Sequence, residues 1–233
     1  MVSFHPDSRF LTDFTTGSLP LSEALCVSAH LYYCGKCRAR VQQLTDVGSH
    51  LFNQLAPETA ESGDDFETLM QRIEQNDAGE PVSDDLATSS RVSVSDPLVG
   101  RMPSVLGKLF QQGLDSLQWV QLGRSLRIAP VDLGDERRET ALYDIRAGGR
   151  MPEHEHRGEE ITVLLKGSFS DRDGKYSRGD FVVRNAGEAH QPTATQDTDC
   201  VCLISLERPV KARALFYRLL EPLVQYRLSR FSN

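Results

Sequence analysis

The sequence predicts a chain with a small all-α domain followed by an all-β domain of antiparallel strands. Three observations predict this division. Before about residue 75 apolar residues recur every three or four positions, which is the helical period. After about residue 105 they alternate in short segments separated by turns. Between the two regions the composition is small and polar, as in a linker, and 233 residues suffice for two domains.

Four helices are expected in the first region. Asp7 is a good N-cap for a short helix that Gly17 ends, and Ser22 is the expected cap of the second. Apolar residues repeat from Val41 to Leu55 in the third helix, and an acidic fourth helix spans Asp64 to Asp77. A domain of this size has a thin core, which a bound metal often reinforces.

The second region contains five segments of strand character. They are residues 118–128, 140–146, 160–165, 181–184 and 200–206. A turn is expected at Asp171–Gly174, between two strands. This pattern is typical of an antiparallel sandwich or barrel. Residues 210–231 return to a helical pattern with five basic residues and one acidic residue.

We therefore expect four parts. They are a helical domain at 1–78, an acidic and polar linker at 79–104, a β domain at 105–208 and a basic helical tail at 209–233. The net charge of −7 comes mainly from residues 58–96, which hold eleven acidic and two basic residues. This distribution argues against nucleic-acid binding by the whole surface, so no direct nucleic-acid partner is expected.

The sequence also predicts a cytoplasmic protein without a membrane segment. No apolar run approaches the ~18 residues that span a bilayer, and the first nine residues lack a signal-peptide pattern. The five cysteines are an odd number spread along the chain. Reduced thiols or metal ligands are therefore expected rather than a disulfide framework.

A first candidate metal site lies in the helical region. His30, Cys34 and Cys37 follow the spacing His-x3-Cys-x2-Cys, which brings all three side chains toward one point around a helical turn. Zinc prefers nitrogen and sulfur donors in a tetrahedron, and a structural site needs a fourth protein ligand. The best candidate is His5, which the flexible N-terminal end can fold back, and Cys26 and His50 are rivals. A redox pair at Cys34 and Cys37 is the alternative, but the segment lacks a βαβ context.

A second candidate metal site lies in the β region. Its ligands would be His154, His156, Glu160 and His190. The two histidines of the His-x-His segment share one face of a strand, because side chains alternate with period two. Glu159 is a rival for the neighbouring Glu160. Three imidazoles and a carboxylate accept several divalent metals, so the residue types alone do not select one.

The second site resembles the cupin family. The spacing Gly148-x5-His154-x-His156-x3-Glu160-x6-Gly167 matches the first cupin motif, and His190 stands at the histidine of the second motif. The second motif departs from the family at Asn185, where proline is usual, and at Ala194, where asparagine is usual. The resemblance implies a double-stranded β-helix, or jelly-roll-like, fold.

The N-terminal region resembles the zinc-binding anti-sigma factors, and most closely the ChrR-type members. His5 lies 25 residues before His30, the separation that this family shows, and residues 5–7, 10–20 and 30–38 look like the family opening. The resemblance implies Zn²⁺ held by His5, His30, Cys34 and Cys37. It also implies a C-terminal cupin-like domain with a second divalent metal, for which we favour Zn²⁺.

The resemblance implies a function in transcription regulation. The chain would bind and inhibit an extracytoplasmic-function-type sigma factor in a 1:1 complex and release it under oxidative stress from singlet oxygen or organic peroxides. The acidic fourth helix is a candidate contact, because acidic helices suit the basic surface of a sigma factor. Its apolar stripe is Phe66, Leu69, Met70 and Ile73. The alternative for this helix is a solvated face over an ordinary core.

Three further points remain open. The chain could be a metal-dependent cupin enzyme, a dioxygenase or isomerase with a helical appendage, but no acid or base beyond the ligands stands out. We therefore do not expect an enzyme. Cys200 and Cys202 share a face of one strand, where they are either redox-active or small core residues. The basic tail could contact the cupin-like region, the sigma factor or nucleic acid, but a solvated amphipathic helix is the favoured interpretation.

Overall fold

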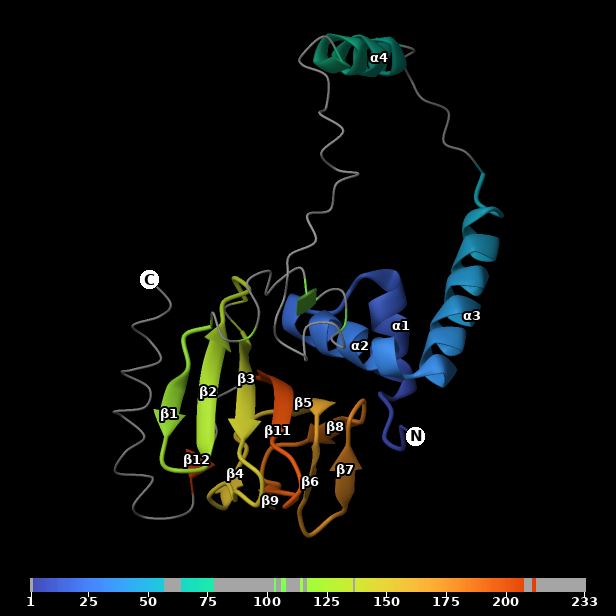
Figure 1. Ribbon diagram of the computed structural model, residues 1–233. Helices are drawn as coiled ribbons and strands as arrows, with labels where there is room; N and C mark the ends of the chain where they lie inside the picture. Colours follow the sequence, from blue (N-terminus) through green and yellow to red (C-terminus); the bar gives the residue numbers. More distant parts are fainter. Residues whose placement is uncertain are drawn as a thin grey trace.

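The computed structural model describes residues 2–56, 64–77, 103, 106–107, 114, 117–135, 137–207 and 211–212. Four helices occupy its N-terminal part (Figure 1). They are α1 (Ser8–Thr16), α2 (Leu21–Tyr33), α3 (Gly35–Phe52) and α4 (Asp64–Asp77). The expected caps of α1 are confirmed, since Asp7 accepts a hydrogen bond from the amide of Phe10 at 3.1 Å and Gly17 adopts a φ of 71°.

The start of α2 differs from the expectation. The cap residue is Pro20, and Ser22 lies inside the first helical turn, where it is buried. The Ser22 hydroxyl donates a hydrogen bond to Asp135 at 3.1 Å. Ser22 therefore joins the helix to the β region instead of capping it.

The β region is antiparallel throughout, which confirms the predicted class. Its strands are β1 (Val120–Leu122), β2 (Leu126–Val131), β3 (Glu139–Ile145), β4 (His154–Glu155), β5 (Glu160–Lys166), β6 (Ser168–Ser170), β7 (Lys175–Ser177), β8 (Phe181–Arg184), β9 (Ala189–His190), β10 (Thr193–Ala194), β11 (Cys200–Leu206) and β12 (Lys211–Ala212). The main sheet has the order β1-β2-β3-β11-β5-β8, and two smaller sheets have the orders β10-β6-β7 and β12-β4-β9.

Most strand predictions agree with the structure, with one split. The segment expected at 118–128 is divided by a turn at Gly123 into β1 and the start of β2. The turn expected at Asp171–Gly174 is confirmed, because the amide of Asp171 donates to the carbonyl of Gly174 at 3.0 Å between β6 and β7.

The start of the predicted helical tail differs from the expectation. Lys211–Ala212 form a strand paired with β4, where a helix was expected. The linker predicted at 79–104 apart from residue 103, and the rest of the predicted basic tail, lie outside the described residues.

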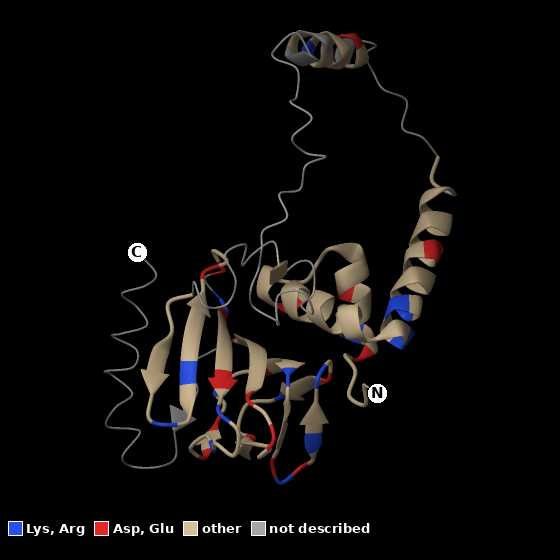
Figure 2. Ribbon diagram, viewed as in Figure 1, with Lys and Arg blue, Asp and Glu red and all other residues tan. Residues whose placement is uncertain are grey.

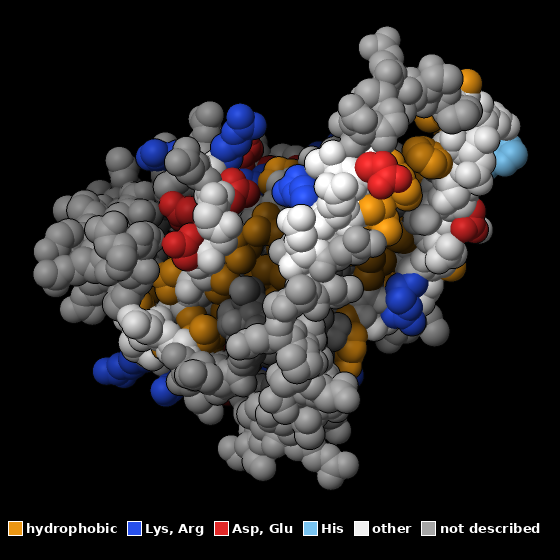
Figure 3. Space-filling model, turned by 90° about the horizontal axis from the view of Figure 1, so that it is seen from above, with side chains coloured by type: hydrophobic (Ala, Val, Ile, Leu, Met, Phe, Trp, Pro, Cys, Tyr) orange, Lys and Arg blue, Asp and Glu red, His pale blue; other side chains and the backbone are white. Residues whose placement is uncertain are grey.

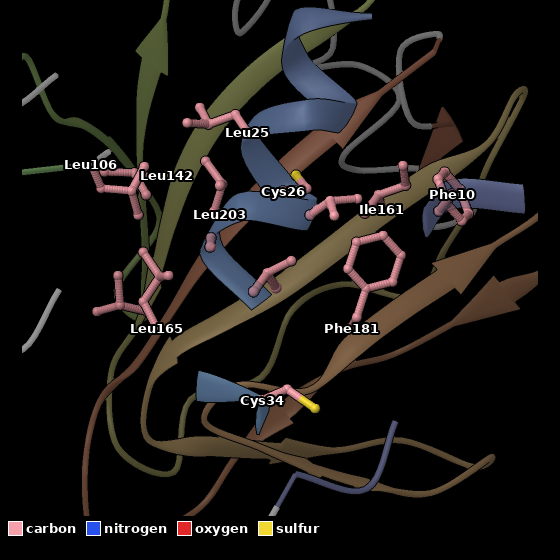
Figure 4. Close-up of a cluster of buried hydrophobic side chains, with 14 of the residues drawn as sticks. Phe10, Leu25, Cys26, Cys34, Leu106, Leu142, Ile161, Leu165, Phe181 and Leu203 are labelled. Carbon is pink, nitrogen blue, oxygen red and sulfur yellow. The ribbon is translucent and has the colours of Figure 1, made fainter. Parts of the chain in front are cut away.

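Helices α1 and α2, the start of α3 and the main sheet share one hydrophobic core. Helix α2 lies on strands β5, β8 and β11, and Figure 4 shows Leu25 and Cys26 of this helix among side chains from the strands. The buried members of this core come from both parts of the chain and include Phe10, Leu25, Val27, Leu142, Ile161 and Leu203. Burial of these side chains away from water fixes α1 and α2 on the sheet.

A second core fills the space between the sheets. It contains Leu164, Phe169 and Tyr176, together with Cys200 and Cys202, which are 0% and 2% exposed. The two thiols therefore lie in the packed interior, with their sulfur atoms 3.6 Å apart. None of the described helices is both long and apolar enough to cross a membrane.

Candidate metal centres

The first predicted set of ligands converges in the structure. It consists of His5, His30, Cys34 and Cys37, whose ligand atoms all lie within 4.8 Å of one another. His5 precedes α1, and His30 lies in the last turn of α2. Cys34 is the residue between α2 and α3, and Cys37 lies in the first turn of α3. We call these four residues the first cluster.

Distances in the first cluster match a tetrahedral zinc site. His5 Nδ1 lies 3.4 Å from Cys34 Sγ and 3.5 Å from Cys37 Sγ. Tetrahedral Zn²⁺ with its usual bond lengths separates nitrogen and sulfur ligands by about 3.6 Å. The amide of Cys37 also donates to Cys34 Sγ at 3.4 Å, which favours a thiolate at that position.

His30 presents a free nitrogen to the first cluster. The ring is fully buried, and its Nδ1–H donates to the carbonyl of Gly179 at 2.7 Å. Its Nε2 is buried without a hydrogen-bond partner among the described residues. Burial lowers the pKa of His30 to about 4, so the ring is neutral and Nε2 carries a lone pair. A cation bound at Nε2 would give this buried nitrogen a partner and offset the free-energy cost of burying it unpaired.

The rival ligands lie elsewhere. Cys26 is fully buried in the shared core, where burial raises the pKa of its thiol. His50 lies on the exposed part of α3 and contacts Gln54 at 2.9 Å. The structure thus brings His5, and neither rival, to the other three side chains.

In the first cluster itself, burial raises the pKa of Cys37 to about 12. A cation bound nearby would lower this pKa and so favour the thiolate.

The second predicted set of ligands also converges. It consists of His154, His156, Glu160 and His190, which are all buried. His190 Nε2 lies 2.9 Å from His154 Nε2 and 3.1 Å from His156 Nε2. Imidazole nitrogens on one ion at its usual bond length lie about 2.9 to 3.4 Å apart, depending on whether the geometry is octahedral or tetrahedral. We call these four residues the second cluster.

Neighbouring groups orient the ligands of the second cluster. His154 Nδ1–H donates to the carbonyl of Pro152 at 2.8 Å, which leaves Nε2 as the lone-pair atom. The hydroxyl of Thr162 donates to Glu160 at 3.0 Å. Asp171 lies 3.4 Å from His190 Nδ1 and is itself held by Arg184 at 2.8 Å. The sequence marked Asp171 only as part of a turn, because the pairing that brings it to His190 is long-range.

The electrostatics of the second cluster suit a cation. Burial lowers the pKa of His156 to about 4, and burial together with the neighbouring imidazoles lowers that of His190 to about 3. Burial also raises the pKa of Glu160. The imidazoles are therefore neutral and available as ligands, and a metal ion would offset the cost of a buried carboxylate.

A small cavity adjoins the second cluster. Its volume is about 20 Å³, and its lining includes His154, His190, Phe169, Met151 and Cys202. Such a cavity has room for about one water molecule. Pockets that hold drug-sized ligands are typically ~300 Å³ or more. The site therefore admits a molecule of the size of water, and an organic substrate does not fit without rearrangement.

The predicted partner-binding residues lie on one exposed helix. Phe66, Leu69, Met70 and Ile73 of α4 are 66%, 53%, 36% and 48% exposed. The sequence did not single out the end of α3 in the same way. There Val47, Leu51, Phe52 and the following Leu55 are all more than half exposed, although the sequence pattern suggested a packed helix. We call these eight residues the apolar helical surface. Figure 3 shows hydrophobic side chains gathered along this part of the molecule.

Comparisons with known proteins agree on one family. Residues 110–209 match the family model of the ChrR cupin-like domain. The chain is 28% identical over 221 residues to the anti-sigma-E factor ChrR of Cereibacter sphaeroides, with 95% of this chain and 97% of that protein covered. It also matches the crystal structure of Rhodobacter sphaeroides SigE in complex with the anti-sigma ChrR, with a TM-score of 0.70, 28% identity, and coverage of 88% of this chain and 99% of that chain.

Proposed function

We propose that this chain, which is similar to the anti-sigma factor ChrR along nearly its whole length, is itself an anti-sigma factor. It binds an extracytoplasmic-function-type sigma factor in a 1:1 complex and so prevents the sigma factor from directing RNA polymerase. The observation that carries this proposal is that the similarity spans both parts of the chain, the helical part with the first cluster and the cupin-like part with the second. The site of action would be the cytoplasm, where sigma factors meet the polymerase.

The apolar helical surface is the proposed contact with the sigma factor. Its eight residues are most of the large exposed hydrophobic side chains in the described part of the chain. Figure 1 shows α3 projecting from the sheet and α4 lying apart from the other elements. After Arg40, α3 carries Asp46 and no lysine or arginine (Figure 2). Exposed apolar side chains on two helices are costly in water and favour burial in a partner.

The first cluster supports this surface by fixing the start of α3. Two of its ligands, Cys34 and Cys37, are the N-cap of α3 and a residue of its first turn, while His30 lies in the last turn of α2 and His5 lies before α1. When bound, Zn²⁺ would crosslink these four points and hold α3 in its projecting direction. Because ligand binding and folding are coupled at such sites, loss of the metal would lower affinity for the sigma factor.

The second cluster is the proposed sensor. Its metal, for which we favour Zn²⁺, would lie beside the small cavity, whose volume suits a molecule of the size of dioxygen or a hydroperoxide group. Singlet oxygen or an organic peroxide would alter the cluster or its surroundings and so favour release of the sigma factor. This part of the proposal requires two states with different affinity for the sigma factor.

The alternative is a metal-dependent cupin enzyme, because three histidines and a glutamate can activate oxygen or water. The small cavity disfavours this hypothesis, since an organic substrate would need a larger space beside the cluster. The fold alone does not decide between the two functions. Turnover of an organic substrate by the purified, metal-loaded chain would favour the enzyme.

Coexpression tests the proposed function directly. The full chain is produced with a sigma factor encoded beside it, and the mass of the purified complex is measured. A 1:1 complex that no longer supports transcription from the cognate promoter is expected. If the two proteins elute separately while each is folded, the proposed function is wrong.

A further inference from the structure

One turn of the β region contacts His30 of the first cluster and the segment that leads to His5. This turn, Gly179–Asp180, precedes β8. The carbonyl of Gly179 accepts the 2.7 Å hydrogen bond from His30 Nδ1, a contact between residues 149 positions apart. Because Nδ1–H is used in this way, Nε2 of His30 is directed at the cluster.

Asp180 holds the segment that carries the other histidine. Its Oδ1 accepts hydrogen bonds from the amides of Ser3 and Phe4 at 2.6 and 3.1 Å, and the amide of Phe181 donates to the carbonyl of Phe4 at 3.0 Å. His5 follows directly in the chain. The position of the His5 ring therefore depends on a carboxylate that is only 1% exposed and belongs to the β region.

The turn itself is hydrogen-bonded and closely packed. Asp180 Oδ2 accepts from the amide and the hydroxyl of Ser177 at 2.8 and 3.2 Å. Gly179 has a φ of 93°, and a Cβ added there would lie 2.6 Å from Cβ of Tyr33 and 2.8 Å from Cγ2 of Val2. Glycine thus permits both the backbone conformation and the close approach of the helical part.

The same turn leads to the second cluster. Strand β8 runs from Phe181, whose ring packs on His30 with centroids 5.9 Å apart, to Arg184. Arg184 is the β-sheet partner of Glu160, a member of the second cluster. Its guanidinium also binds Asp171, which lies beside His190. A strand of four residues spans about 13 Å, so a short, hydrogen-bonded element joins the two clusters.

We infer that the Gly179–Asp180 turn couples the two clusters, so that a metal ion in the second cluster raises the affinity of the first cluster for zinc. Asp180 is the positioning residue in this coupling. The inference rests on the proposed function, because it supplies a route by which a change at the sensor reaches the helices that would bind the sigma factor. Coupling of this kind is reciprocal and is carried by an element that both sites contact.

Zinc competition on the full chain tests the inference. The affinity of the first cluster is measured against a chromophoric chelator, with the second cluster intact and in a His154→Ala, His156→Ala variant. We expect the affinity of the first cluster to fall at least about fivefold when the second cluster is disabled. Equal affinities in the two proteins would overturn the inference.

Variants of Asp180 test whether the coupling between the two clusters passes through this residue. Asp180→Ala is expected to lower the zinc affinity of the first cluster and to make this affinity independent of the second cluster. Asp180→Asn keeps an acceptor oxygen, so it should retain part of the affinity and part of the dependence. The matched control is Asp144→Asn, at a buried aspartate of β3 that pairs with Arg127. Full dependence on the second cluster in Asp180→Ala would contradict the assigned route.

Cobalt separates positioning from general stability. Co²⁺ bound to the first cluster gives sulfur-to-metal and ligand-field absorption bands that report its geometry. These bands should shift in Asp180→Ala and remain in Asp144→Asn, even if both variants lose equal thermal stability. Sigma binding is measured in parallel. If the wild-type chain binds the sigma factor but shows no coupling, only this inference fails, whereas a chain that never binds the sigma factor refutes the proposed function.

Discussion

Glu159 and Glu160 are adjacent in the chain, but their carboxylates lie on opposite sides of the main sheet. Glu160 belongs to the second cluster, whereas Glu159 pairs with Arg9 of α1 at 3.2 Å and with Arg138 at 3.5 Å. Side chains alternate across a strand, so one backbone segment presents one carboxylate to the cluster and the other to the helices. Glu160, rather than Glu159, is therefore positioned to be a ligand of the second cluster.

Replacing both thiols of the first cluster tests the zinc scaffold. Cys34→Ser with Cys37→Ser should lower the metal content from two ions per chain to one and abolish the sigma complex, because the start of α3 loses its anchor. Elemental analysis and size-exclusion chromatography measure the two effects. The control is Cys26→Ala, which removes a buried thiol outside both clusters. A doubly substituted chain that still binds the sigma factor normally would refute the scaffold role.

Disabling the second cluster tests the sensor. A His154→Ala, His156→Ala chain supplied with excess zinc should still bind the sigma factor, because the apolar helical surface is unchanged. Release of the sigma factor by singlet oxygen or an organic peroxide should be strongly reduced, as followed by transcription from a sigma-dependent promoter. His50→Gln, at an exposed histidine of α3, provides the control. A normal oxidant response in the double variant would exclude a sensing role.

Charges placed on the apolar helical surface test the interface. Leu51→Asp with Phe66→Asp should weaken sigma binding at least about tenfold, because both side chains are proposed to be buried only in the complex. The melting temperature of the free chain should hardly change, since these residues are 59% and 66% exposed. Gln71→Asp adds a charge at an exposed polar position of α4 as a control. Unchanged affinity in the double variant would place the interface elsewhere.

Arg138 tests the attachment of the helices to the sheet. Its guanidinium lies 3.0 Å from Glu23 of α2, and the two side chains are 5% and 8% exposed. Arg138→Met should lower the free energy of unfolding by about 3–5 kcal/mol, because it leaves the Glu23 carboxylate buried without its partner. Denaturant titration measures this. Arg172→Met removes an exposed pair with Asp173 and should cost less than about 1 kcal/mol. Similar losses for both variants would contradict the buried role of Arg138.

The metal-free chain should become less stable as the pH falls. Burial lowers the pKa of His30 to about 4 from its ordinary 6.5, so the unfolded chain binds the proton more readily than the folded chain. Stability is therefore retained above pH 6.5 and decreases as the pH falls toward 4, by up to about 1.4 kcal/mol per pH unit for each such histidine. Denaturation at pH 7 and pH 5 tests this, with His30→Asn expected to show a smaller difference than His50→Gln. Equal stability of the unsubstituted chain at both pH values would contradict it.

Local features of the fold were predictable because they depend on neighbouring residues. Asp7 and Gly17 delimit α1, Asp171–Gly174 forms a turn, and the period of the strands predicts β8 and β11 at their observed bounds. The cap of α2 was not predictable in the same way. Ser22 has the chemistry of a cap, but its hydroxyl is used by Asp135, 113 residues away. Tertiary contacts outweighed local preference there.

The sequence by itself determined the local part of each ligand set, because in His-x3-Cys-x2-Cys and His-x-His the ligands are only two to four residues apart and neighbouring backbone geometry keeps them close. Only the tertiary structure decided what surrounds them. It placed His5 rather than Cys26 or His50 with the first cluster, and it set Gly179 and Asp180 against that cluster. These choices depend on contacts between residues more than a hundred positions apart, and such contacts arise from burial of apolar surface over the whole chain, which no local pattern encodes.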